Sequence, residues 1–321
     1  MTRLSLILAC VVLLVSGCRQ PNPEDSKVDF SSRAIRVVAT TNIVADLVSR
    51  VGEGRLEVHS LMGPGVDPHL FKASAGDVTR MAEADVVVYN GLHLEGKMTE
   101  VFEQMRGRGI PTLAVAEDTA LQSSLRESEL FQGNFDPHVW FDVTLWMRVA
   151  RATERYFATL DPVHADTYAA NTAAYVVELE AAHRYVLEQA ESVPEALRVL
   201  VTSHDAFGYF GLAYGFEVRG LQGISTATEA GTADVQDVAA MVASRRIPAM
   251  FIESSVSPRG IEAVREAVRA RGFEVAIGGT LYGDALGGPA SDAATYLSMV
   301  RHNVDTIVDA LLETRGDAAG D

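Results

Sequence analysis

Short apolar runs rich in β-branched residues alternate along the chain with segments whose apolar residues recur every three or four positions. The first kind of pattern predicts buried strands, and the second predicts helices that cover them. Strands that alternate with helices favour a mostly parallel sheet with right-handed crossovers. In the first half we expect strands at Ile35–Thr40, Leu56–Leu61, Asp85–Tyr89 and Pro111–Val115. We expect one helix that runs through Val51 after a cap at Asn42, and further helices at Ala73–Ala84, Lys97–Arg106 and Val143–Leu160.

The same alternation returns after a long helical stretch without glycine, which runs from Asp161 to about Ser192. A helix of about 30 residues would be ~45 Å long, enough to run along two lobes. In the second half the pattern predicts strands at Arg198–Thr202, Phe216–Arg219, Ala249–Glu253 and Glu274–Ile277, and helices at Ala206–Tyr214, Thr232–Arg245, Pro258–Arg271 and Ser291–Leu312. The predicted fold class is therefore α/β, with two lobes that each contain a mainly parallel four-stranded sheet flanked by helices.

The first residues look like an export signal rather than part of the fold. An apolar run from Leu4 to Val15 is too short to span a bilayer comfortably, and it ends in small residues followed by Cys18. This ending resembles a bacterial lipobox, so residues 1–17 are expected to be a signal peptide and Cys18 to be lipidated; an ordinary secretory cleavage site is the alternative. Residues 18–33, with their prolines and charges, are expected to form a flexible tether.

These signals divide the rest of the chain into three parts. We expect an N-terminal lobe over residues 34–160, a linking helix over 161–193 and a C-terminal lobe over 194–321. The net charge of −16 argues against a nucleic-acid partner. The only cysteines are Cys10 and Cys18, so the mature chain has neither a disulfide nor a thiolate metal site.

Two copies of the tripeptide Asp-Pro-His are the strongest candidate for chemistry. Proline restricts its own backbone and that of the preceding Asp, so His69 and His138 each emerge from a stiff turn. A third histidine, His204, follows an apolar strand-like run. Ligands of open α/β sheets bind beyond the carboxyl ends of the strands, where we expect His69, His204 and Glu253 to lie. These residues suggest a site for one cation.

The fourth ligand is less clear from the residues alone. Asp284 lies in a glycine-rich loop after a predicted strand, and it could be either a metal ligand or an ordinary turn or helix-capping residue. Glu253 is a candidate for the hydrogen bond that a metal-bound histidine usually makes with its second nitrogen. The other histidines are expected to be structural or exposed, namely His59, His93, His164, His183 and His302.

Several motifs together resemble those of the TroA-like metal-binding lipoproteins, which deliver manganese or zinc to ABC importers. The resemblance runs from about Arg33 to Leu312, and the matching motifs are Gly63–His69, Asn90–Gly96, Asp136–Asp142, His204–Phe210, Gly220–Thr226, Phe251–Pro258 and Gly278–Gly287. It implies two α/β lobes joined by one long helix. It also places the four metal ligands at His69, His138, His204 and Asp284. Many manganese-specific streptococcal relatives have Glu where this chain has His204.

The resemblance implies a capture protein that delivers a divalent ion to an ABC permease in the membrane. We expect a monomer that is exported and lipid-anchored to the bacterial cell envelope, in the periplasm or on the outer face of the cytoplasmic membrane. Four protein ligands would leave no open position for an activated water, so we expect no enzymatic activity. A metal-dependent hydrolase using the same cluster, with Glu253 or Asp205 as base, and an adhesin are the alternatives.

The identity of the ion is the hardest question for the sequence. Three nitrogens and one carboxylate suit Zn²⁺, which binds more tightly than Mn²⁺ at most such sites. Zinc-specialised relatives often carry a His-rich loop before the second ligand, whereas Glu117–Phe135 contains no histidine. The motifs are closest to those of manganese importers. We therefore favour Mn²⁺, followed closely by Zn²⁺, with Fe²⁺ as a further candidate.

Overall fold

The apolar runs and amphipathic segments form parallel sheets covered by helices. The computed structural model describes residues 29–127, 131 and 133–313. The first half contains β1 (Ile35–Ala39), α1 (Asn42–Val51), β2 (Leu56–Ser60), α2 (Ala75–Glu83), β3 (Val86–Tyr89), α3 (Thr99–Gly107), β4 (Thr112–Ala114) and α4 (Val143–Leu160). The second half follows the long helix α5 (Ala165–Ser192) and contains β5 (Val199–His204), α6 (Gly208–Tyr214), β6 (Glu217–Gln222), α7 (Thr232–Arg245), β7 (Ala249–Glu253), α8 (Arg259–Arg269), β8 (Ala276–Leu281) and α9 (Tyr296–Glu313).

The first-half sheet is parallel throughout, with strand order β2-β1-β3-β4. The second-half strands are hydrogen-bonded as two parallel pairs, β5–β6 and β7–β8, with β5 packed beside β7. The second half therefore contains two two-stranded parallel sheets instead of the single four-stranded sheet that was predicted. Where the two sheets adjoin, the backbone N–H of His204 at the end of β5 donates to the side chain of Glu253 at the end of β7.

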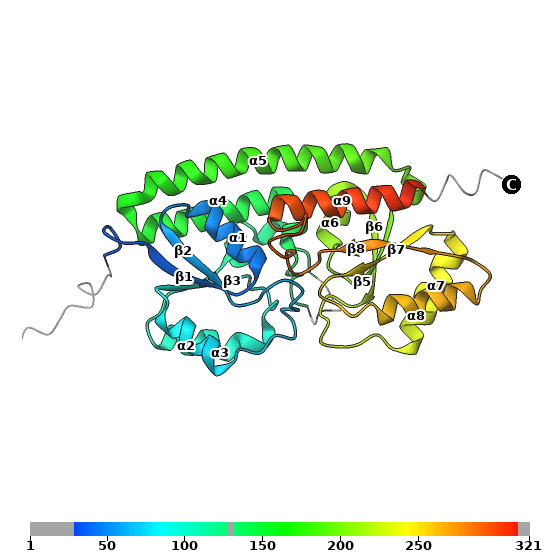
Figure 1. Cartoon of the computed structure of the whole chain (residues 1–321), viewed down its shortest axis with the longest axis horizontal. Coiled ribbons are helices and arrows are strands. Elements are labelled where there is room, and N and C mark those ends of the chain that lie inside the picture. The colour runs from blue at the N-terminus through cyan, green and yellow to red at the C-terminus, as the bar shows by residue number, and fades with distance from the viewer. Residues whose placement is uncertain (1–28, 128–130, 132, 314–321) are drawn as a thin grey trace, which may run out of the picture.

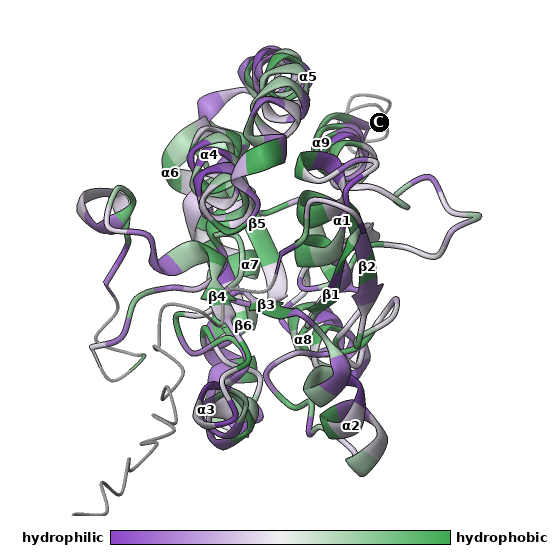
Figure 2. Cartoon of the chain, turned by 90° about the vertical axis from the view of Figure 1, so that its left-hand side faces the viewer, coloured by the Kyte–Doolittle hydropathy of each residue, from purple (hydrophilic) through white to green (hydrophobic). Residues whose placement is uncertain are grey.

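Helix α5 runs along both halves of the molecule (Figure 1). Its 28 residues span about 42 Å at 1.5 Å per residue. It packs against α1, α4 and α9, and in the end-on view these helices lie on the opposite side of the molecule from α2 and α3 (Figure 2). Its buried side chains follow one stripe along the helix, and they include Tyr168, Tyr175, Leu179, Val186 and Ala190.

One large apolar core continues from the first half into the second through this helical layer. It includes Ile35 of β1, Trp146 of α4, Leu179 of α5 and Phe251 of β7. Two smaller clusters lie elsewhere, a methionine-rich one beneath β1 and β3, and one between α7, α8 and the second-half strands. Because this shared core packs both halves against the same helices, it holds in place the loops of each half that face the other half.

The folded part begins earlier than the predicted tether boundary at residue 33. Phe30 is buried, and Arg33 Nη1 lies 2.6 Å from Asp85 Oδ2. Cys18 and residues 1–17 lie outside the described residues. In the part of the chain that the structure describes, no helix combines the length and the apolar character needed to cross a membrane.

Candidate metal centre

His69 is presented by the loop between β2 and α2. The Asp67 carboxylate accepts a hydrogen bond from the His69 backbone N–H at 2.9 Å, which closes a tight turn around Pro68. The same loop reaches toward the other half of the molecule at Gly65, where the backbone adopts a φ of +71°. A Cβ at this position would lie 3.3 Å from the Ser254 carbonyl oxygen. The turn and this close approach together fix where His69 enters the centre.

His138 is held by the second Asp-Pro-His turn, just before α4. Asp136 Oδ1 accepts from the His138 backbone N–H at 3.0 Å and lies 2.7 Å from the ring Nδ1. Arg126 donates to the other Asp136 oxygen at 3.1 Å, and the Tyr209 hydroxyl donates to the Asp136 carbonyl oxygen at 3.0 Å. Because Nδ1 faces this carboxylate, the ring presents Nε2 toward the centre. Metal-bound histidines are commonly oriented by a carboxylate in this way.

His204 is the last residue of β5, and Glu253 is the last residue of β7. The predicted strand before His204 ended at Thr202, and β5 extends to include the histidine, whereas β7 ends at Glu253 as predicted. Glu253 Oε1 accepts the His204 backbone N–H at 2.9 Å, and Oε2 lies 2.8 Å from the ring Nδ1. Glu253 thus orients His204 as Asp136 orients His138.

Asp284 lies in the loop after β8, which several hydrogen bonds hold in place. Asn303 of α9 binds both the N–H and the carbonyl of Tyr282, each at 2.9 Å. The Trp140 indole donates to the Gly283 carbonyl at 3.1 Å, so the loop is also tied to the segment that carries His138. The Asp284 carboxylate therefore has a fixed position.

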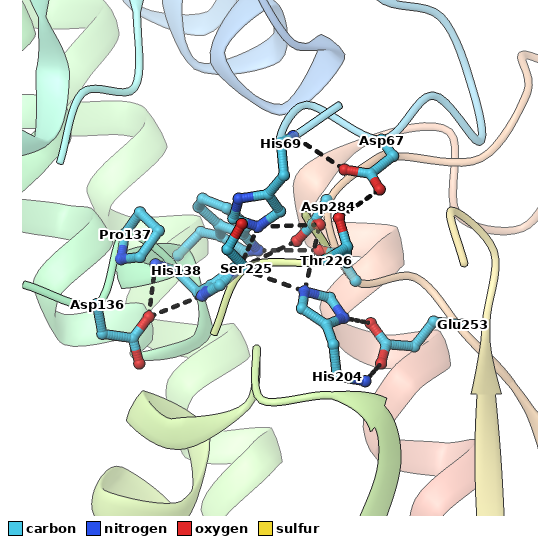
Figure 3. A network of polar contacts seen from close by, with 12 residues as sticks. Asp67, His69, Asp136, Pro137, His138, His204, Ser225, Thr226, Glu253 and Asp284 are labelled. Carbon is cyan, nitrogen blue, oxygen red and sulfur yellow. Dashed lines mark hydrogen bonds and ion pairs between the residues drawn. The ribbon is translucent and has the colours of Figure 1, made fainter. Parts of the chain in front are cut away.

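These four side chains converge from the two halves of the molecule, as Figure 3 shows, and each is at most 3% exposed. His138 Nε2 lies 3.3 Å from His69 Nε2 and 3.4 Å from His204 Nε2. Asp284 oxygens lie 3.3 Å from the Nε2 atoms of His138 and His204 and 3.7 Å from that of His69. One ligand atom from each residue falls within a 4.8 Å cluster. Imidazole and carboxylate donors this close together can surround a single cation.

Burial and charge act differently on the three imidazoles. Burial lowers the pKa of His69 to about 3, so this ring is neutral at physiological pH. Burial acts in the same direction on His138, but Asp136 and Asp284 outweigh it and raise the pKa of His138 to about 9. At His204 burial is likewise outweighed, by the Glu253 and Asp284 carboxylates, and the pKa is raised well above its ordinary value.

Asp284 is the buried negative charge of the centre. Burial by itself would raise its pKa, but His204 and His138 hold the pKa well below its ordinary value. Neither of its oxygens accepts a hydrogen bond from any residue in the described ranges. A buried carboxylate without such donors is costly unless a cation faces it. Protons on His138 and His204 and a metal ion are therefore alternative partners for Asp284.

The remaining histidines lie away from this cluster. His59 and His93 are exposed, and His164, His183 and His302 pair with Asp161, Tyr214 and Asp292 respectively. The prediction from sequence that these five are structural or exposed agrees with their positions. His93 has a left-handed backbone with φ of +64°, and it lies on a cavity wall that also includes His69.

Asp136 and Arg126 are the site residues that were not singled out from the sequence. The repeated Asp-Pro-His tripeptide contained a signal for Asp136, since an Asp two residues before a histidine can bond its backbone N–H. Arg126 gave no such signal, because its partners Asp136 and Asp205 come from separate loops.

Gly283 offers a test of the Glu253 contact. A Cβ at this position would lie 2.2 Å from Glu253 Oε2, so Gly283→Ala must displace the carboxylate that orients His204. We expect metal affinity to fall roughly 10–100-fold, as it does when outer-shell partners are lost. Isothermal titration would measure the change, with Gly107→Ala, whose Cβ would meet only open space, as the matched control. Unchanged affinity in Gly283→Ala would show that the Glu253 contact does not matter.

Comparison with known proteins shows the class to which this fold and this cluster belong. Residues 37–310 match the family model described as "ZnuA: Zinc-uptake complex component A periplasmic", a family of metal-binding proteins that serve as the substrate-binding parts of ABC importers. The chain belongs to the ZnuA family. This confirms the resemblance seen in the sequence motifs. It also confirms that the chain is not an enzyme, because the family and the relatives below are binding components.

Individual relatives cover nearly the whole chain. The zinc-binding protein TroA of Treponema pallidum (strain Nichols) is 48% identical over 305 residues, which is 95% of this chain and 98% of TroA. The manganese-binding lipoprotein MntA of Bacillus subtilis (strain 168) is 43% identical over 287 residues, covering 89% of this chain and 93% of MntA. The solved structure of the periplasmic zinc-binding protein TroA from Treponema pallidum superposes with a TM-score of 0.82 at 47% identity, covering 87% of this chain and 99% of the other. The likeness confirms the predicted fold, with parallel sheets flanked by helices and one long helix.

Proposed function

We propose that this protein captures one divalent transition-metal ion between its two halves, with His69, His138, His204 and Asp284 as the ligands, and delivers it to an ABC permease. The observation that carries the proposal is Asp284, a buried carboxylate that accepts no hydrogen bond from the described residues and faces three imidazole Nε2 atoms. Zinc and manganese sites in proteins use these ligand types. Four buried protein ligands make this a holding site rather than a hydrolytic one.

The proposed cargo is Mn²⁺, with Zn²⁺ as its close competitor. Within the described part of the chain neither Asp284 oxygen accepts a hydrogen bond, so the carboxylate can supply two ligand atoms and enlarge the coordination shell. Zn²⁺ prefers four tetrahedral ligands, whereas carboxylate oxygens suit Mn²⁺. Relatives named for zinc and for manganese are both similar to this chain, which supports an ion from this pair without choosing between them.

The proposal extends to where the protein acts. Cys18 would carry a lipid after removal of residues 1–17, and residues 34–160 and 194–321 would form the two lobes on either side of the linking helix. The description of the similar MntA as a lipoprotein supports an envelope-anchored protein. A lipid on the mature N-terminus would keep the binding site close to the membrane that holds the permease.

Elemental analysis of protein purified without chelator, followed by competitive titration with Mn²⁺, Zn²⁺ and Fe²⁺, tests the function. We expect one equivalent of ion per chain. Preparations free of metal that also fail to bind any of the three ions would overturn the proposal. Preferential retention of Zn²⁺ at equal free concentrations would leave the site intact but correct the cargo.

Metal binding should also raise thermal stability. An ion that binds only the folded state at 1,000 times its Kd stabilises the fold by about 4 kcal/mol. For a chain of this size that corresponds to a rise in Tm of about 10 °C. Differential scanning calorimetry should show this rise with Mn²⁺ and Zn²⁺. Mg²⁺, which prefers oxygen ligands and keeps its waters, serves as the control and should give little change. An equal rise with Mg²⁺ would contradict a nitrogen-rich site.

A further inference from the structure

The three imidazoles of the centre are not held equally firmly. His138 and His204 each face a buried carboxylate at Nδ1, at 2.7 Å and 2.8 Å respectively. For His69, no hydrogen bond at Nδ1 is found among the described residues, and the backbone N–H is fixed by Asp67 instead. The orientation of His69 therefore depends on the position of its loop.

That loop is fastened to the opposite half of the molecule by one short hydrogen bond. The Thr226 hydroxyl donates to Asp67 Oδ2 at 2.6 Å, while Asp67 Oδ1 accepts from the His69 backbone (Figure 3). Asp67 follows β2, whereas Thr226 lies between β6 and α7. Thr226 is 6% exposed, so water competes little for this bond. The two residues connect the halves directly beside a ligand.

The segment that carries Thr226 borders two cavities. One cavity of about 650 Å³ is lined by Gln222–Ser225, by Ala227–Ala230 and, of the four candidate ligands, by His69. A second cavity of about 430 Å³ is lined by Asp67, Thr226 and Glu229. The Thr226–Asp67 hydrogen bond is thus a specific contact with the other half, made from a segment that borders two cavities.

We propose that Thr226 and Asp67 form a positioning pair that sets the rate at which the bound ion leaves. The Thr226 hydroxyl holds Asp67, Asp67 holds the backbone of His69, and His69 closes the side of the centre that borders the larger cavity. This inference rests on the proposed function. Loss of the Thr226 hydroxyl frees the loop and its histidine, so the ion dissociates faster while the other three ligands remain in place.

Thr226→Val removes the donor and keeps the side-chain volume. The rate of dissociation of Mn²⁺, and separately of Zn²⁺, is measured by stopped flow after mixing the loaded protein with excess EDTA. We expect Thr226→Val to release either ion roughly 10-fold faster or more, within the range seen when outer-shell partners are lost. Thr226→Ser keeps the hydroxyl and should restore a rate close to that of the wild type. Thr226→Ala removes the same donor and should also release the ion faster. It serves as the second test if Thr226→Val folds poorly.

Thr228→Val is the matched control, because Thr228 is exposed in the same loop. The Tm of each metal-free variant shows whether faster release comes from the loss of His69 positioning or from a general loss of stability. We expect faster release only in Thr226→Val and Thr226→Ala, with a metal-free Tm that falls by no more than the few degrees that the loss of one buried hydrogen bond causes. Wild-type release rates in both, or equally fast release in Thr228→Val or Thr226→Ser, would overturn the positioning pair. Wild-type protein that binds neither ion would overturn the proposed function itself.

Discussion

Replacement of His138 by alanine is expected to abolish tight metal binding. His138 Nε2 is the atom nearest the middle of the cluster, within 3.4 Å of the other two imidazole nitrogens and of Asp284. Under the proposed function, this replacement removes a metal ligand and not merely a residue that orients one. The Kd should therefore rise by more than the roughly 10–100-fold that outer-shell losses cause.

The fold should survive this replacement. Asp136, which faces His138, remains paired with Arg126 at 3.1 Å, so no uncompensated carboxylate is left behind. Isothermal titration with Mn²⁺ and Zn²⁺ gives the affinity, and circular dichroism of the metal-free protein checks the fold. His59→Ala, at an exposed position on β2, is the matched control and should bind as the wild type does. Near-wild-type affinity in His138→Ala would refute its role as a ligand.

Acidification is expected to weaken binding steeply. Without metal, His138 has a pKa near 9 and His204 a pKa well above its ordinary value, so both hold a proton at pH 7. His69 is already neutral, with a pKa of about 3. A metal ion needs neutral nitrogens and must displace up to two protons, so log Kd should fall by about one to two units for each unit rise in pH between 6 and 8.

Proton release measures this linkage directly. Titration of weakly buffered protein at pH 7 with Mn²⁺ or Zn²⁺ should liberate between one and two protons for each ion bound. His59→Ala should release the same number, because its side chain lies outside the cluster. Affinity that stays flat from pH 7.5 to about 5.5, with no proton release, would contradict three histidine ligands.

The sequence was sufficient to predict most elements because their apolar patterns are strong. Helices α4 and α7 and strand β7 have the predicted bounds. The predicted and observed bounds differ at the ends of elements, because side-chain hydrogen bonds there determine where a helix begins. Thr41, not Asn42, caps α1 by accepting from the Val44 backbone. Helix α9 begins at Tyr296 instead of near Ser291, whose side chain bonds the Gly288 carbonyl in a preceding turn.

Part of the candidate metal site could also be predicted from local sequence patterns. His69, His138 and His204 could be singled out because proline turns and strand ends are local features of sequence. Asp284 could not be separated from a turn residue by its neighbours, and the resemblance to a family was needed to choose it. Contacts such as Thr226 with Asp67, 159 residues apart, arise only when the two halves fold against each other. No local pattern reports such a contact.

The proposed centre holds one ion among four side chains contributed by both halves. Anomalous X-ray diffraction from crystals of the zinc-loaded protein tests it most directly. We expect one strong peak about 2.0–2.2 Å from the Nε2 atoms of His69, His138 and His204 and from an Asp284 oxygen. A peak elsewhere on the protein, or one that leaves any of these four residues beyond bonding distance, would contradict it.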